Sequence, residues 1–298
     1  MTVQHRAIAF QCGSDWLYGI LSLPKAVEQI PSPVGRGILV VVGGPQYRVG
    51  SHRQFALLAQ SLATRQIPVM RFDYRGMGDS EGAARNFEEI DGDLRAALDA
   101  FCAAVPGLSE VVIWGLCDAA SAALFYAHQD RRVTGLVLLN PWVRTEAGMA
   151  KAYLKHYYLS RLMAPALWRK IFTGGFQFGA TMRSFISLVG AAARKRPDPA
   201  STSTAGARQI AVTDADTLPE RMLIGLERFE GRVLVILSGN DLTAQEFSDV
   251  VEASPRWRRR LQADGVRRHR LEAANHTFSQ REWRDQVAGW TADWTRSW

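Results

Sequence analysis

The chain has 298 residues, of which 47% are hydrophobic, so it can bury a large core as one α/β domain with an insertion or as two domains. Its three cysteines are widely spaced and form no C-x-x-C pair, which excludes a disulfide framework and favours a reducing compartment. The histidines lack H-x-x-x-H and H-E-x-x-H spacing, and no G-x-G-x-x-G or P-loop pattern occurs, so we expect neither a metal nor a nucleotide cofactor.

The positive charge is concentrated in one segment. Residues 143–213 contain eleven basic and two acidic residues, so this segment carries +9 and the rest of the chain −2, which gives the net charge of +7. The N-terminus lacks the apolar core of a signal peptide, and no uncharged apolar run reaches 18 residues. We therefore expect a cytoplasmic protein in which one segment faces an anionic neighbour.

Strand and helix patterns alternate along most of the chain. Residues 5–11 and 15–23 alternate apolar and polar side chains around a short turn, which predicts an antiparallel hairpin. Further strands are expected at residues 38–42, 68–72, 110–114, 133–140, 233–237 and 267–271, and helices at 52–65, 87–103, 119–128, 218–229 and 280–298. This alternation predicts a mostly parallel eight-stranded sheet with helices on both faces.

The alternation breaks at residues 143–215, which contain aromatic-rich helical pieces and end in a low-complexity loop at 194–206. We expect this segment to be a helical cap inserted into a core formed by residues 1–142 and 216–298.

A nucleophile elbow is predicted at Gly115-Leu116-Cys117-Asp118-Ala119, where an apolar strand turns into a helix. The pattern corresponds to G-x-S-x-G with Cys in place of Ser and Ala in place of the last Gly. Small residues two positions before and after the nucleophile let the strand and helix backbones pass closely. Taken alone, the pentapeptide fits a buried structural cysteine equally well.

Two further candidate catalytic residues each come after a different predicted strand. Asp241 comes after the strand at 233–237, and His276 after the strand at 267–271. Alone, Asp241 fits a helix N-cap and His276 a surface residue. The order Cys117, Asp241, His276 is nevertheless that of an α/β-hydrolase triad, and each residue lies where ligands bind to open parallel sheets. We therefore predict a Cys–His–Asp triad.

In this triad His276 accepts the thiol proton and Asp241 orients the imidazole. The oxyanion needs two N–H donors. One is the backbone N–H of Asp118, whose carboxylate we expect to play no part. The second is the N–H of Gly44 or, as second choice, of Gln46, because Pro45 between them has no N–H.

Several other residues receive less specific assignments. His52 and Trp142 are candidate substrate contacts, although His52 also fits the beginning of a helix. We expect Cys12 and Cys102 to be inert and three charged residues in and after the second buried strand to be structural ion-pair partners, namely Arg71, Asp73 and Arg75.

The sequence resembles the α/β-hydrolase superfamily. Asp73-x-Arg75-Gly76-x-Gly78-x-Ser80 is similar to the D-x-R-G-x-G-x-S segment of that fold, and Gly43-Gly44-Pro45 to its H-G-G-P oxyanion loop, with Val42 in place of His. Residues 43–47, 50–55, 114–120, 238–247 and 275–279 resemble, more narrowly, the exosortase A system-associated hydrolases of the first type. That resemblance implies a hydrolase encoded beside exopolysaccharide and protein-sorting genes, often near acyl carrier protein and acyl-ligase genes.

These observations predict an acyl hydrolase that acts on an ester or, in preference, a thioester through an acyl-cysteine intermediate. A cysteine nucleophile also resembles dienelactone hydrolases and polyhydroxyalkanoate synthases. The basic, aromatic segment fits an acyl group carried on acyl carrier protein or coenzyme A. Two alternatives stay open: an acyltransferase to a hydroxyl acceptor, and a catalytically silent binding module. Residues 171–193 could contact an anionic membrane. No nucleic-acid module is recognised, and the oligomeric state is left open.

Overall fold

The structure is a computed structural model that describes residues 3–24, 35–44, 46–143 and 217–298. The chain divides into two units, residues 1–145 with 214–298 and residues 146–213. The predicted cap, apart from Val143, and the predicted membrane contact at 171–193 lie outside the described residues. Within the described part of the chain, no helix is long and apolar enough to cross a membrane.

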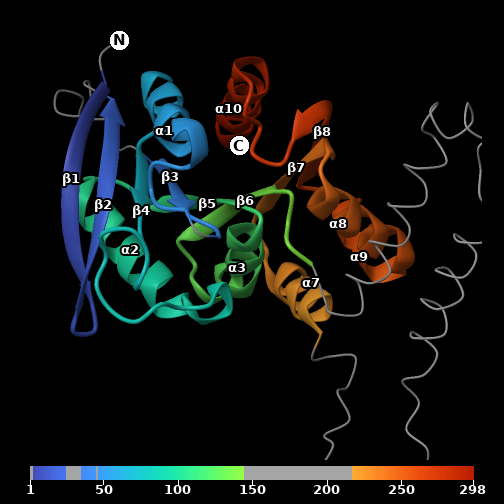
Figure 1. Ribbon diagram of the computed structural model, residues 1–298, viewed down its shortest axis with the longest axis horizontal. Helices are drawn as coiled ribbons and strands as arrows, with labels where there is room; N and C mark the ends of the chain where they lie inside the picture. The colour runs from blue at the N-terminus through green and yellow to red at the C-terminus, as the bar shows by residue number, and fades with distance from the viewer. Residues whose placement is uncertain (1–2, 25–34, 45, 144–216) are drawn as a thin grey trace, which may run out of the picture. The chain divides into compact units, whose positions relative to one another are not determined.

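An eight-stranded sheet forms the centre of the first unit (Figure 1). The strand order is β1-β2-β4-β3-β5-β6-β7-β8. β1 runs antiparallel to β2, and β2 runs antiparallel to β4, whereas all other neighbours are parallel. The predicted α/β-hydrolase architecture is confirmed. The strands are β1 (Val3–Cys12), β2 (Asp15–Pro24), β3 (Arg36–Val41), β4 (Val69–Phe72), β5 (Glu110–Leu116), β6 (Val133–Leu139), β7 (Arg232–Asn240) and β8 (Val266–Asn275).

The sequence patterns explain these strands. The β1–β2 hairpin turns at Gly13, whose φ of 64° is readily adopted by a residue without a Cβ. The central strands β3, β5 and β6 are continuous apolar runs with nearly every residue buried, because helices cover both faces of the sheet there.

Helices pack on both sides of the sheet and bury two separate apolar clusters (Figure 1). Helices α1 and α10 cover one face, and their side chains join the smaller cluster. Helices α2, α3, α7, α8 and α9 contribute to the larger cluster on the other face. The helices are α1 (Gln54–Thr64), α2 (Asp91–Ala104), α3 (Asp118–Tyr126), α7 (Leu218–Arg228), α8 (Leu242–Ala253), α9 (Pro255–Leu261) and α10 (Arg281–Thr295), with short 3-10 helices η2 (Ser51–Arg53), η3 (Phe87–Glu89) and η4 (Ala127–Gln129).

The structure departs from the sequence expectations at several elements. Strands β7 and β8 extend to Asn240 and Asn275, past their expected ends, and the helix expected at 87–103 begins at Asp91 after the short η3. Helix α9 was not predicted, although the hydroxyl of Ser254 accepts from the N–H of Trp257 at 3.4 Å and Pro255 occupies the first helical position. The helix expected at 52–65 begins at Gln54, because His52 and Arg53 have φ values of 52° and 60°.

Three charged residues in and after β4 were expected to form structural ion pairs, and two of them, Asp73 and Arg75, do so. The fully buried carboxylate of Asp73 accepts from the guanidinium and the backbone N–H of Arg48. Arg75 forms an ion pair of 2.8 Å with the buried carboxylate of Asp93. Arg71 makes no ion pair with a described residue; its guanidinium donates to the carbonyl oxygen of Arg48, and burial lowers its pKa to about 10.

Candidate active site

Cys117 occupies the sharp turn between β5 and α3. Its φ of 64° and ψ of −126° lie outside the regions that side-chain-bearing residues usually adopt, so the surrounding hydrogen bonds must hold it there. Its N–H donates to the carbonyl oxygen of Leu139 on β6 at 2.9 Å, and its carbonyl oxygen accepts from the N–H of Ala120 at 3.1 Å. The thiol therefore stands at the carboxyl edge of the sheet on a rigid turn.

The small residues around Cys117 are sterically required. A Cβ on Gly115 would lie 2.6 Å from the carbonyl carbon of Ala119 and 2.7 Å from the backbone nitrogen of Ala120, distances that real Cβ atoms do not show. Ala119 itself is 1% exposed. The predicted elbow thus follows from the close passage of strand and helix.

The structure brings the three predicted triad residues together. Asp241 lies between β7 and α8, and His276 follows β8 directly. The Nδ1 atom of His276 lies 2.9 Å from Oδ2 of Asp241. The hydrogen bond with Asp241, and next the hydrogen bond with Cys117, raise the pKa of His276 from 6.5 to about 10, against the opposing effect of burial. The imidazolium is therefore favoured between a carboxylate and a sulfur atom.

Asn140 is a site residue that the sequence did not reveal. It follows β6 with a φ of 42° and is fully buried. Its amide nitrogen donates to the hydroxyl of Ser238 at 2.8 Å and to the carbonyl oxygen of His276 at 3.1 Å, and its amide oxygen accepts from the N–H of Ser238 at 2.9 Å. Asn140 thus connects β6, β7 and the backbone of the triad histidine. The only sequence signal is an amide at the end of an apolar strand.

The loop after β3 passes unusually close to the start of α3. A Cβ on Gly43 would lie 2.2 Å from Oδ1 of Asp118 and 2.7 Å from the carbonyl oxygen of Leu116. The N–H of Gly44 donates to Oδ2 of Asp118 at 2.9 Å. The Asp118 carboxylate, expected from the sequence to have no role, thus accepts the very N–H that was the first choice as second oxyanion donor.

The other oxyanion candidate, Gln46, is fixed through its side chain. Its amide oxygen accepts from the N–H of Ser51 at 3.1 Å and from the amide of Gln54 at 3.5 Å. Among the described residues, the backbone N–H of Gln46 has no hydrogen-bond partner.

The two candidate substrate contacts differ in their surroundings. His52 is exposed on the short helix η2. The N–H of Trp142 donates to the carbonyl oxygen of Cys117 at 3.2 Å, and the carbonyl oxygen of Trp142 accepts from the hydroxyl of Ser121 at 2.7 Å. The backbone of Trp142 is therefore attached directly to the elbow.

Among the described residues, neither the other two cysteines nor the potential metal ligands form a second reactive site. Cys12 is buried in the β1–β2 hairpin, Cys102 is half-buried on α2, and burial raises the pKa of both thiols. Within the described ranges, no group of three or more His, Cys, Asp or Glu side chains could hold a metal ion.

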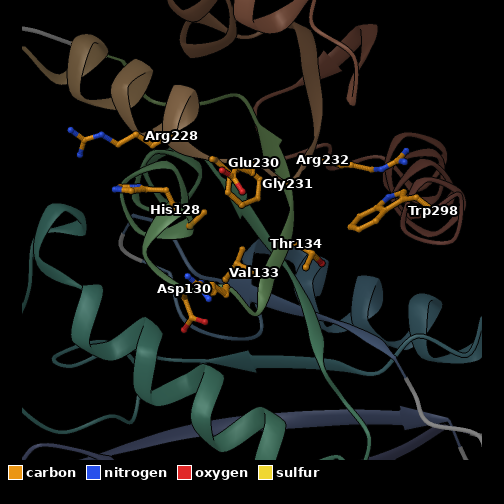
Figure 2. Close-up of a pocket in the computed structure, with 12 residues that line it drawn as sticks. His128, Asp130, Val133, Thr134, Arg228, Glu230, Gly231, Arg232 and Trp298 are labelled. Atoms are coloured by element: carbon orange, nitrogen blue, oxygen red, sulfur yellow. The ribbon is translucent and has the colours of Figure 1, made fainter.

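A separate pocket of about 690 Å³ lies at the amino ends of β6 and β7 (Figure 2). His128 and Arg228 lie on one side of it, and Arg232 and Trp298 on the other. Burial, and next the charge of Arg228, lower the pKa of His128. The pocket contains none of the triad residues, which lie at the opposite, carboxyl edge, where open parallel sheets bind their ligands.

Comparisons with known proteins agree with this fold. No curated protein matches the sequence. An esterase from Pyrococcus furiosus is similar in structure, with a TM-score of 0.63 and 12% identity over 99% of this chain and 92% of the esterase. A dienelactone hydrolase from Anabaena variabilis has a TM-score of 0.57 and 14% identity over 99% and 97% of the two chains. A hydrolase from Agrobacterium vitis, titled as putative, has a TM-score of 0.53 and 18% identity over 99% and 100%.

At these identities the solved structures establish the fold alone. The sequence itself matches the Alpha/beta hydrolase family over residues 38–290, which is most of the chain. That span includes the elbow, Asp241 and His276, and the protein belongs to the alpha/beta hydrolase family.

Proposed function

We propose that this protein is an acyl hydrolase that cleaves a thioester, in preference to an oxygen ester, through an acyl-cysteine intermediate on Cys117. One observation carries the proposal. The thiol on the elbow, with its φ of 64°, faces an imidazole that is held 2.9 Å from Asp241 and whose pKa is raised to about 10. His276 is thereby positioned to take the proton of the thiol during attack, which generates the reactive form of a cysteine nucleophile.

The reaction proceeds in two halves. His276 takes the proton of the Cys117 thiol, and the sulfur attacks the substrate carbonyl carbon, whose π electrons move to oxygen. The tetrahedral intermediate collapses, and the leaving thiolate takes the proton from the imidazolium. Water, deprotonated by His276, then attacks the acyl-cysteine, and the Cys117 sulfur leaves with the returned proton. Asp241 keeps the imidazole oriented throughout.

Chemistry supports a thioester as the substrate. Attack of a thiolate on a thioester exchanges two similar leaving groups, whereas an oxygen ester must expel a poorer one. The segment 143–213 carries +9, which suits an anionic acyl carrier protein or coenzyme A. The three free cysteines suit a reducing cytoplasm, and the resemblance to exosortase A system-associated hydrolases supports an acyl-carrying neighbour.

The test compares butyryl-N-acetylcysteamine with p-nitrophenyl butyrate as substrates for the wild type, Cys117→Ala and Cys102→Ala. We expect thioester turnover with a butyryl adduct on Cys117 in the intact mass, loss of both in Cys117→Ala, and wild-type behaviour in Cys102→Ala. Undiminished turnover by folded Cys117→Ala would refute the proposal.

The same assay separates the two alternatives. Turnover that accelerates with a sugar or lipid hydroxyl, and yields ester in place of free acid, identifies an acyltransferase. Absence of both turnover and acyl adduct in folded wild type identifies a catalytically silent binding module.

A further inference from the structure

The carboxylate of Asp118 collects backbone N–H donors at the mouth of the elbow. Oδ2 accepts from the N–H of Gly44 at 2.9 Å, and Oδ1 accepts from the N–H of Ala119 at 2.9 Å. Two N–H groups from two separate elements thus converge on one carboxylate.

This convergence is a built anion site. The N–H of Ala119 belongs to the first turn of α3, where the helix dipole favours negative charge. The N–H of Gly44 belongs to the loop after β3, whose approach is so close that only a glycine fits at position 43. Burial raises the pKa of Asp118, and the hydrogen bonds from Gly44 and Ala119 act in the opposite direction.

The oxyanion of a substrate needs the same groups. A carbonyl attacked by Cys117 places its oxygen next to the sulfur, within reach of the N–H that follows the nucleophile and an N–H of the facing loop. The loop N–H, that of Gly44, now donates to the Asp118 carboxylate. The chain's own carboxylate and the substrate oxyanion therefore compete for this donor.

We propose that the Asp118 carboxylate is the resting occupant of the oxyanion hole, which the substrate displaces, and that it thereby determines acyl specificity. The inference rests on the proposed function of Cys117. After displacement the carboxylate stays within one side-chain rotation of the reacting carbonyl. It therefore disfavours acyl groups that carry a second negative charge near that carbonyl, such as succinyl, relative to uncharged groups such as butyryl.

Butanal and iodoacetamide together isolate this effect. Butanal adds to the Cys117 sulfur as a hemithioacetal: the S–C bond forms, the carbonyl π pair moves to oxygen, and that oxygen receives the thiol proton through His276. Its oxygen needs the oxyanion hole. Iodoacetamide alkylates the same sulfur by displacing iodide and needs no such hole. The ratio of butanal affinity to the rate of alkylation by iodoacetamide therefore reports on the oxyanion hole independently of thiol reactivity.

The variants are Asp118→Asn, Asp118→Ala and, as a matched charge control, Asp285→Asn on the exposed surface of α10. We expect Asp118→Asn to bind butanal at least about tenfold more tightly than the wild type, after correction for any change in alkylation rate. Its preference for butyryl- over succinyl-N-acetylcysteamine should also shrink about tenfold. Asp285→Asn should match the wild type in both measurements.

Butanal affinity that is unchanged or weaker in both Asp118 variants, after correction for the alkylation rate, would overturn the inference. The carboxylate would then only fix the loop after β3 through its hydrogen bond with Gly44. Failure of the proposed function is distinguishable, because butanal addition and alkylation require the thiol but no turnover. If the wild type hydrolyses no thioester but Asp118→Asn still binds butanal more tightly, the proposed hydrolase function is refuted. The proposal that the Asp118 carboxylate occupies the oxyanion hole is then retained.

Discussion

The carboxylate of Asp241 binds His276 and the first turn of α8 at the same time. Oδ2 lies 2.9 Å from Nδ1 of His276 and accepts from the N–H of Ala244 at 3.1 Å, while Oδ1 accepts from the N–H of Thr243 at 3.3 Å. The structural and the catalytic interpretations of this residue are therefore compatible: the N-cap interaction fixes the carboxylate at the point where the imidazole needs it.

Substitutions of Asp241 should separate these two roles. Asparagine is as good an N-cap as aspartate, so we expect Asp241→Asn to keep the wild-type free energy of unfolding, whereas Asp241→Ala should lose about 1 kcal/mol. Both variants should lose about a thousandfold or more in kcat/KM for a thioester, because neither stabilises the imidazolium. Urea unfolding and steady-state kinetics provide the two measurements. Equal activity in wild type and Asp241→Asn would contradict the assignment.

The raised pKa of His276 predicts a pH dependence of stability with a definite sign. The folded state holds the proton up to about pH 10 and the unfolded state only to about 6.5. The stabilising contribution is therefore complete below pH 6.5 and is lost as the pH rises to about 10. The difference in the free energy of unfolding between wild type and His276→Gln should decrease over that range in urea titrations.

His269 provides a control of opposite sign. Burial, and next the charge of Arg267, lower its pKa, and its ring stacks on Trp290 with centroids 4.2 Å apart. The difference in stability between wild type and His269→Gln should therefore be largest above pH 6.5 and fall as the pH drops through the lowered pKa. If both histidine variants showed the same slope, the pKa direction assigned to one of them would be wrong.

The features predicted correctly from the sequence depend on local patterns. Apolar runs, their alternation with helical periods and the small residues at the elbow are each decided within a few positions of the chain. Position 115 is an example: only glycine fits there, because a Cβ would collide with the backbone of Ala119, four residues later. Since parallel strands end at one edge, three such local signals also sufficed to bring Cys117, Asp241 and His276 together.

The features that the sequence missed depend on contacts between distant segments. Asn140 bonds to residues 98 and 136 positions away, and nothing near it distinguishes it from a turn residue. The carboxylate of Asp118 reaches Gly44 across 74 positions. From the sequence, Asp118 is simply an acidic residue in the first turn of a helix, a position where such residues are common. Its role depends on how closely the glycine loop approaches.

Cys117 should be the cysteine that reacts first with iodoacetamide at pH 7. Burial raises the pKa of Cys12 and of Cys102, so these thiols stay protonated, whereas the sulfur of Cys117 is hydrogen-bonded to His276, which can act as its base. Intact mass spectrometry should show one rapid adduct, mapped by peptide analysis to Cys117. The adduct should be absent in Cys117→Ala and slower in His276→Gln. Faster labelling of Cys102 would contradict this order of reactivity.

Asn140 should act as a positioning residue for His276. Asn140→Ala leaves the buried N–H of Ser238 and the carbonyl oxygen of His276 without these partners, so we expect a loss of about 1–3 kcal/mol in the free energy of unfolding. Asparagine also tolerates the φ of 42° better than alanine.

A second variant and a second measurement distinguish positioning of His276 from a purely structural role. In Asn140→Asp, one carboxylate oxygen still accepts from the N–H of Ser238, but no amide donates to the carbonyl of His276. We expect kcat for a thioester to fall at least about tenfold with little change in KM, because the imidazole loses its alignment with the sulfur while the rest of the substrate site persists. The pH profile of Cys117 alkylation should shift in both variants. A fully active Asn140→Asp with an unshifted profile would show that Asn140 stabilises the fold alone.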